Sequence, residues 1–174
     1  SHVHWDRKLD ALLAYGVMSI QAVKEVGIGE GSGLSGRRGS EAHDAISWDG
    51  EGYRRETSRA GGIEGGISNG DLIVVTAAMK PLATLNRPVL KTVDVGTKRE
   101  TLSFKERTDV TAVPAMGVVA ETMVALVLAN EALRKFGGDS VAEVARNKDS
   151  FMSSLGRTPS AASEVRGPGE ALGD

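Results

Sequence analysis

Residues 58–70 read Ser-Arg-Ala-Gly-Gly-Ile-Glu-Gly-Gly-Ile-Ser-Asn-Gly and lead directly into the apolar stretch 72–79. Because glycine has no Cβ, backbone of this composition can lie flat against a planar ring or offer its N–H groups to an anion. The alternative is a hairpin connection that feeds the strand at Leu72, and for an isolated glycine cluster this is the commoner case. The stretch is neither a G-x-G-x-x-G opening a helix nor a P-loop. By itself it identifies no ligand.

Strand signals flank this stretch. Residues 72–79 are rich in Ile and Val and follow the Asn69-Gly70 turn signal, and residues 89–95 alternate in polarity up to Gly96. A shorter strand is predicted over 53–57. Together these segments predict antiparallel pairing.

Helical spacing occurs in three places. Residues 6–24 predict one amphipathic helix capped by Asp6. Residues 140–146 predict a short helix that Ser140 caps, with Glu143 three residues further on. The longest helix is predicted over 115–135, between Pro114 and the Gly137-Gly138 pair. Polar residues interrupt its apolar run and favour a buried core helix over a membrane span. Between the first helix and the glycine stretch, residues 27–39 predict a mobile surface loop whose Arg37 and Arg38 are solvated.

Composition limits the class of protein. The chain has 174 residues, a 40% hydrophobic fraction and a net charge of -2, which predicts one soluble domain without a strong field for nucleic acid or a membrane surface. It has no cysteine, which fits a cytoplasmic location, and no metal site is predicted from its three histidines. No signal peptide is visible, and the start at Ser1 suggests truncation. Residues 1–148 are predicted to form the domain and 149–174 a disordered tail.

Two further segments carry candidate chemistry. Residues 80–84 read Lys-Pro-Leu-Ala-Thr, where Pro81 ends a strand beside a lysine that could bind a phosphate or a flavin carbonyl. The alternative is a solvated lysine at a strand end. Residues 107–109 read Arg-Thr-Asp, either a structural ion pair or an anion-binding arginine that leaves Asp109 able to accept a proton.

The order and spacing of these segments resemble the chorismate synthase family. The matching stretches run from residue 1 to about 147, and they are Trp5–Ala11, Met18–Lys24, Arg59–Gly70, Lys80–Thr84, Arg107–Val119 and Leu133–Ser140. The resemblance implies an α+β fold in which helices pack between antiparallel sheets as a β-α-β sandwich, here only in part. It also implies a homotetramer in the full-length enzyme.

The resemblance further implies an activity, the anti-1,4 elimination of phosphate from 5-enolpyruvylshikimate 3-phosphate to give chorismate, with reduced FMN as cofactor and NADPH as a candidate reductant. Asp109 takes the place of the aspartate that assists proton removal. The implied FMN-binding residues are Gln21, Ala22, Gly65, Lys80, Pro81, Leu82, Ala83, Thr84 and Arg107.

Some features depart from the family pattern. Thr108, Ser58 and Ala83 replace residues that are more usual in the family, with size or hydrogen bonding largely kept. The family's N-terminal half, with its two catalytic histidines, has no match in this sequence, so the chain alone is predicted to be inactive and to associate. The alternatives are a non-catalytic nucleotide- or phosphate-binding module and a structural interaction domain.

Overall fold

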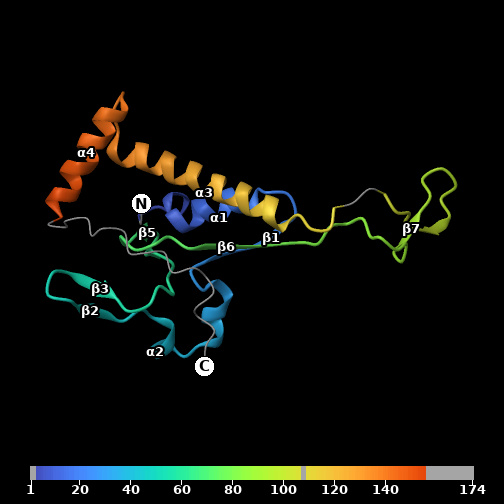
Figure 1. Cartoon of the computed structure of the whole chain (residues 1–174), viewed down its shortest axis with the longest axis horizontal. Helices are drawn as coiled ribbons and strands as arrows, with labels where there is room; N and C mark the ends of the chain where they lie inside the picture. Colours follow the sequence, from blue (N-terminus) through green and yellow to red (C-terminus); the bar gives the residue numbers. More distant parts are fainter. Residues whose placement is uncertain (1–2, 107–108, 156–174) are drawn as a thin grey trace. The chain divides into compact units, whose positions relative to one another are not determined.

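The computed structural model describes residues 3–106 and 109–155. Two compact units divide within one helix, the first ending at Glu131 and the second beginning at Ala132. Figure 1 shows the helices and antiparallel strands of the chain. The predicted α+β class is confirmed.

The first unit begins with a 3-10 turn, η1 (Trp5–Arg7), followed by α1 (Leu9–Met18). The helix predicted over 6–24 is therefore right at its centre and wrong at both ends. Asp6 lies within η1 and does not cap α1, whose N-cap is Lys8. Ser19 closes α1, since its N–H bonds to the Tyr15 carbonyl and its hydroxyl donates to the Gly16 carbonyl at 2.7 Å. Ala22 then takes a left-handed conformation, φ 67°, that turns the chain into a strand.

That strand, β1 (Val23–Ile28), pairs antiparallel with β6 (Val75–Met79). Their register runs from Val23 opposite Met79 to Ile28 opposite Val75. The strand predicted over 72–79 is confirmed in its second part. The other strands of the described residues form antiparallel pairs: β2 (Ile46–Trp48) with β3 (Tyr53–Arg55), β4 (Ile63–Glu64) with β5 (Ile67–Ser68), and β7 (Lys91–Val93) with β8 (Glu100–Leu102).

The segment predicted as a mobile loop over 27–39 has regular structure. Its first residues complete β1, and a 3-10 helix, η2 (Gly31–Gly36), and a short helix, α2 (Gly39–Ala42), follow. Arg37 is not simply solvated, because its Nε donates to Glu30 Oε2 at 2.8 Å. The sequence did not predict this regular structure because the glycines interrupt the apolar periodicity, although they do not prevent backbone hydrogen bonding.

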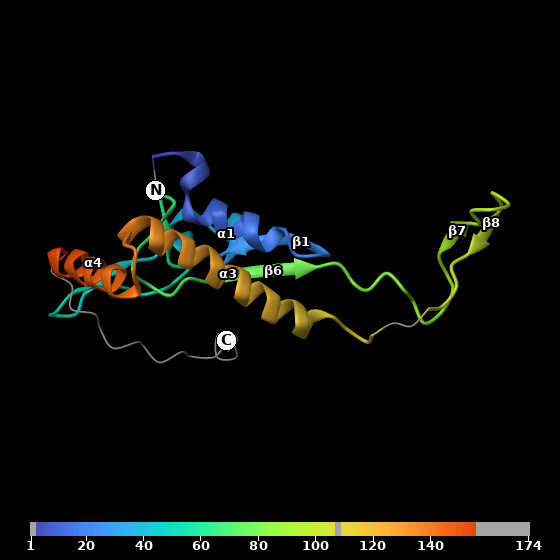
Figure 2. The ribbon, with the colours of Figure 1, turned by 90° about the horizontal axis from the view of Figure 1, so that it is seen from above.

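The core of the first unit joins α1 to β4 and to α3 (Val113–Phe136). Leu9, Leu13 and Ile63 form the buried cluster, and the α3 side chains packed against it are Val124, Val127 and Leu128. Gly16 allows this approach, since a Cβ there would lie 3.0 Å from Val127 Cγ2. Figures 1 and 2 both show α3 running alongside α1.

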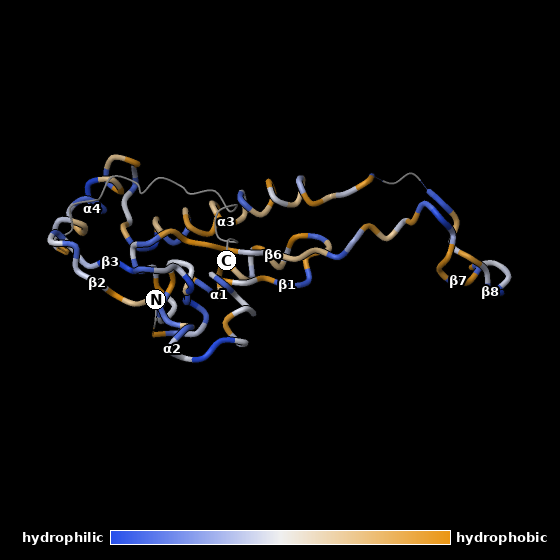
Figure 3. Tube along the Cα trace, turned by 60° about the horizontal axis from the view of Figure 1, so that its bottom comes forward, coloured by the Kyte–Doolittle hydropathy of each residue, from blue (hydrophilic) through white to orange (hydrophobic). Residues whose placement is uncertain are grey.

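α3 is nevertheless not the buried core helix that was predicted. None of its described residues is buried, and Val118 and Leu126 are 65% and 55% exposed. Figure 3 shows apolar residues along its length. Among the described helices, α3 alone has the length and apolar composition of a membrane span. Core helices of soluble proteins can have the same length and composition, so these two properties do not assign α3 to a membrane. Val110, in the segment that leads to α3, is fully exposed.

The second unit contains the end of α3 and α4 (Val141–Ser154), joined at Gly137 and Gly138. The predicted cap is confirmed, since the Glu143 N–H donates to the Ser140 hydroxyl at 3.3 Å. Asn147 Nδ2 donates to the Phe136 carbonyl at 2.9 Å. α4 is longer than predicted and crosses the boundary placed at 148, while the tail residues 156–174 lie outside the described residues.

Candidate functional site

The first part of the candidate site lies where α1 passes into β1. The left-handed conformation of Ala22 aims its carbonyl at β6, where it accepts the Lys80 N–H at 2.7 Å. This bond, next to the Val23–Met79 pair, places Gln21 and Ala22 beside Lys80. Three of the predicted cofactor-binding residues are therefore brought together by the strand register, although they are far apart in sequence.

The turn after β6 supplies a cation and a hydroxyl near that junction. Lys80 and Pro81 are exposed, whereas Leu82 and Thr84 are half-buried. Ala83 is exposed. The backbone N–H of Lys80 donates to the Ala22 carbonyl, and the proline that follows restricts the Lys80 backbone to extended conformations.

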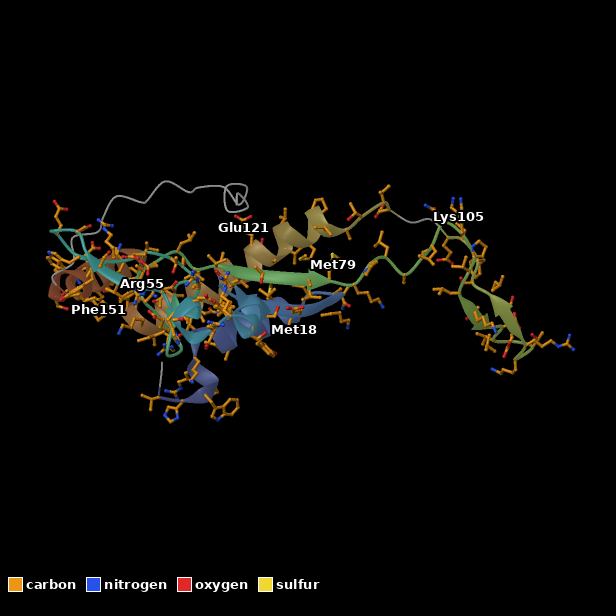
Figure 4. The ribbon with its side chains drawn as sticks, turned by 90° about the horizontal axis from the view of Figure 1, so that it is seen from below. Met18, Arg55, Met79, Lys105, Glu121 and Phe151 are labelled. Carbon is orange, nitrogen blue, oxygen red and sulfur yellow. The ribbon has the colours of Figure 1, made fainter. Side chains whose placement is uncertain are left out.

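A shallow open depression lies on the last turn of α1, just before Gln21. It is lined mainly by apolar atoms of Ala14, Tyr15, Met18 and Ser19. Tyr15 and Met18 are 80% and 44% exposed. Figure 4 labels Met18 on α1 and Met79, the residue before Lys80. An apolar surface of this kind can support one face of a flat ring.

The second part of the site is the glycine hairpin β4–β5. Gly65 and Gly66 form its two-residue turn with φ of 61° and 82°, the left-handed pair that tight hairpins need. A Cβ on Gly66 would lie 2.6 Å from Lys8 Cγ, but a Cβ on Gly65 would meet nothing within 4 Å. Gly65 is also exposed, so its backbone faces open space.

The other glycines of the stretch have structural reasons. A Cβ on Gly61 would lie 2.3 Å from the Gly29 nitrogen, and one on Gly62 would lie 2.4 Å from the Leu72 carbonyl oxygen. Both are buried and have positive φ. The hairpin interpretation thus explains Gly61, Gly62 and Gly66, and leaves Gly65 as the position open to a ligand.

Sequence reasoning missed the side chain that anchors the start of this stretch, Asp44. Its Oδ1 accepts from the Thr57 hydroxyl and from the Arg59 N–H at 2.8 Å, and its Oδ2 accepts from the Ala60 N–H at 3.0 Å. Burial alone would raise the pKa of the Asp44 carboxyl, but the hydrogen bonds from Thr57 and from the two backbone groups outweigh burial and lower that pKa. These bonds span 13 to 16 residues, so no local spacing signals them.

A second missed residue is Arg55 on β3. Its Nη2 pairs with Glu64 Oε2, and its Nη1 donates to Asp71 Oδ2 at 3.0 Å. Glu64 lies just before the Gly65–Gly66 turn, and Asp71 lies after β5. The only signal in the sequence is that a basic residue precedes two acidic ones, which is too common to be specific.

These two parts of the site stand at opposite ends of α1. The Gly66 carbonyl accepts the Leu9 N–H at 2.8 Å at the start of the helix, whereas Ala22 follows its end. Ten residues separate these ends, roughly 15 Å at 1.5 Å per residue. The predicted grouping of Gly65, Lys80, Arg107 and Asp109 around one ring stays a prediction.

Arg107 lies outside the described residues, and Asp109 is exposed in the segment that leads to α3. Among the described residues, no group of three or more His, Cys, Asp or Glu side chains is arranged to hold a metal ion.

The features above define an α+β protein in which a glycine turn and a Lys-Pro turn present open backbone and a cation at the surface. A model of the family described as chorismate synthase matches residues 1–133. The chain belongs to the chorismate synthase family.

Individual relatives agree. The curated chorismate synthase of Thermobifida fusca is 58% identical over 155 residues, which make up 89% of this chain and 39% of that protein. The chorismate synthase of Micrococcus luteus is 55% identical over 166 residues, 95% of this chain and 40% of that protein. A solved structure titled "Crystal Structure of Chorismate Synthase" matches with TM-score 0.70 and 40% identity, over 89% of this chain and 39% of that chain. The chain thus spans about two fifths of the length of these relatives.

Proposed function

We propose that this chain is the C-terminal part of a chorismate synthase. The complete protein would act in the cytoplasm and eliminate phosphate from 5-enolpyruvylshikimate 3-phosphate to give chorismate, with reduced FMN as cofactor. The observation that carries the proposal is the 58% identity along 89% of the chain to a curated chorismate synthase. The corresponding enzyme class is the carbon–oxygen lyases that act on phosphates.

The residues present fit FMN. Gly65 has no neighbour on its Cβ side, so its backbone can approach a flat group, and Ala22 is held by its bond to the Lys80 N–H. The Lys80 ammonium, with Arg107, would neutralise phosphate or carbonyl oxygens, and Thr84 would add a hydroxyl donor. When bound, reduced FMN supplies electron density that helps the allylic C–O bond break.

In the 1,4-elimination the C–O electron pair leaves with phosphate, the existing ring double bond shifts to the carbon that loses phosphate, and the C–H electron pair forms the second double bond. The Asp109 carboxylate would assist removal of the ring proton, and Arg107 would stabilise the charge that develops on the departing phosphate. Both residues precede α3, so one short segment would carry the acid–base and the electrostatic roles.

Phosphate release tests this proposal. The polypeptide expressed from the complete gene, including any sequence encoded ahead of Ser1, should release phosphate from the substrate in the presence of reduced FMN. Asp109→Asn should abolish turnover while sparing flavin binding. Asp149→Asn is the matched control because Asp149 is an exposed aspartate on α4, paired with its neighbour Lys148 at 3.3 Å. Supplying NADPH or a chemical reductant in turn tells which one the enzyme uses.

Two negative results of this experiment would have different meanings. Flavin binding without phosphate release would favour the non-catalytic binding module, and an Asp109→Asn variant with full activity would remove the catalytic role of Asp109. Residues 1–174 alone are expected to release no phosphate.

Self-association is the last part of the proposal. The exposed apolar side chains of α3, together with Trp48 and Tyr53 on the β2–β3 hairpin, support contacts with further chain or further copies, as in the proposed homotetramer. Analytical ultracentrifugation that finds residues 1–174 as a stable, well-dispersed monomer would contradict this expectation.

A further inference from the structure

We propose that Arg55 is a positioning residue, which holds the Gly65–Gly66 turn in the orientation that presents the Gly65 backbone to the flavin. The proposal rests on the proposed function, since Gly65 is assigned to the flavin there. It assigns Arg55 a role on the reaction although it stands on a different hairpin from the turn it holds.

The geometry places Arg55 across the base of the turn. One end of its guanidinium pairs with Glu64, the residue immediately before Gly65, and the other donates to Asp71 at 3.0 Å. The Arg55 side chain is only 20% exposed, whereas Glu64 and Asp71 are 46% and 36% exposed. Arg55 is thus the most buried member of the group, and the carboxylates come to it from the outside. Figure 4 labels Arg55 among a dense set of side chains.

Asn69 completes the network. Its Nδ2 donates to Glu64 Oε2 at 2.8 Å, and its Oδ1 accepts the Asp71 N–H at 3.0 Å. Glu64 and Asp71 are therefore joined twice, through Arg55 and through Asn69. The segment between them contains the β4–β5 hairpin, so the network closes that hairpin at its base.

The two sides of the Gly65–Gly66 turn are held differently. On one side the Gly66 carbonyl accepts the Leu9 N–H at 2.8 Å. On the other side the tie is Glu64, and Gly65 itself meets no atom on its Cβ side. Loss of the Arg55 pairs would leave Gly66 held by Leu9 and Glu64 held by Asn69. With the Arg55 tie lost, the direction of the Gly65 backbone would be less constrained while the core stays folded.

Arginine suits this place better than lysine. The planar guanidinium reaches two carboxylates with separate N–H groups, which the single ammonium of lysine cannot do with the same geometry. The Arg55 Nε is buried and has no hydrogen-bond partner among the described residues. The side chain therefore holds its position through its two terminal nitrogens, and a lysine that keeps the charge should restore only part of the effect.

The adjacent residue provides a matched control. Arg54 is also on β3 and also forms an ion pair, but its partner is Asp49 within the β2–β3 hairpin. Asp49 is not in the glycine stretch, so Arg54→Leu removes one arginine and one ion pair from the same strand without touching the turn.

The test uses the polypeptide expressed from the complete gene. Flavin affinity is measured by fluorescence titration, kcat and KM by phosphate release, and hydrogen exchange of peptides covering residues 61–71 by mass spectrometry. Arg55→Leu should weaken flavin binding by about tenfold, the usual scale for a lost charge-assisted hydrogen bond, and should accelerate exchange in 61–71. Arg55→Lys should recover part of the affinity. Arg54→Leu should leave the flavin affinity and the hydrogen exchange of residues 61–71 at their wild-type values.

The outcomes separate the two proposals. A wild-type protein that binds no flavin overturns the proposed function, and the exchange comparison still decides whether Arg55 holds the turn. A wild-type protein that binds flavin, with Arg55→Leu equal to Arg54→Leu in affinity and exchange, overturns the positioning role. If Arg55→Leu fails to fold, Glu64→Gln replaces it, because this change removes the charge that Arg55 pairs with and keeps an acceptor for Asn69.

Discussion

Replacing Gly65 and Gly66 in turn by alanine separates a ligand-facing glycine from a structural one. Both residues are left-handed, so alanine costs roughly 1–2 kcal/mol at either position. At Gly66 the new Cβ also lies 2.6 Å from Lys8 Cγ and 2.9 Å from Lys8 Cβ, so overpacking adds about 1–3 kcal/mol. At Gly65 the Cβ meets nothing within 4 Å. Urea unfolding should therefore show that Gly66→Ala is the more destabilised variant.

Flavin binding should show the opposite order. A methyl group on Gly65 occupies the space where the flavin would approach, so Gly65→Ala should lose about tenfold in affinity or more, equal to about 1.4 kcal/mol. Gly66→Ala, measured at low denaturant where it is folded, should lose less. The reasoning is refuted if Gly65→Ala binds reduced FMN as tightly as the wild type, because the open face of Gly65 would then have no ligand.

Three other changes test the packing and the anchors. Leu13→Ala should destabilise the chain by about 2–5 kcal/mol in urea unfolding because Leu13 is fully buried, whereas Val118→Ala on the exposed part of α3 should change stability little. Asp44 has a lowered pKa, so its contribution to stability is present above its usual value of 3.8 and is lost as the pH falls through the folded-state pKa; Asp44→Asn should flatten this acid limb of the stability–pH curve. Ser140→Ala should destabilise α4 by about 1 kcal/mol, visible as faster hydrogen exchange in 141–147, because it removes the hydroxyl that accepts from the Glu143 N–H.

Local signals in the sequence predicted local structure. Ser140 and Glu143 predicted the start of α4, and the glycines after Phe136 predicted the end of α3. The sequence-based predictions failed where contacts with residues far away along the chain determine the local structure. Residues 19–24 keep a helical spacing, but pairing of β1 with β6 overrides it, since the gain from a strand partner some fifty positions away is invisible in a local window. β8 has no strand signal for the same reason and forms only opposite β7.

The candidate site divides in the same way. The family resemblance supplied Ala22 and Lys80, but only the β1–β6 register explains why they meet, since the Ala22 carbonyl is positioned by a left-handed residue that no propensity favours. Asp44 and Arg55 were missed because their partners lie at least nine residues away along the chain. An aspartate before a strand or an arginine within one has many ordinary uses.

The burial of α3 was the largest error, and its cause is physical. Apolar residues on more than one face predict a helix covered on more than one face. In the described residues only the face with Val124, Val127 and Leu128 is packed, against the α1 core. The apolar pattern of α3 therefore predicts contacts beyond those that the described residues make, as expected for a chain that covers 39% of a relative's length.

The hairpin interpretation explains most residues of the glycine stretch, and the ligand interpretation stays a prediction for Gly65. The hairpin interpretation accounts for Gly61, Gly62 and Gly66, since a side chain at each would strike backbone or Lys8. It accounts for the conformation of Gly65 but not for the empty space beside it. A left-handed turn position in open solvent accepts asparagine nearly as well as glycine. The space around Gly65 therefore does not by itself require glycine there. Under the proposed function the approach of the flavin to its backbone would require it, and Arg55 would hold the turn in that orientation.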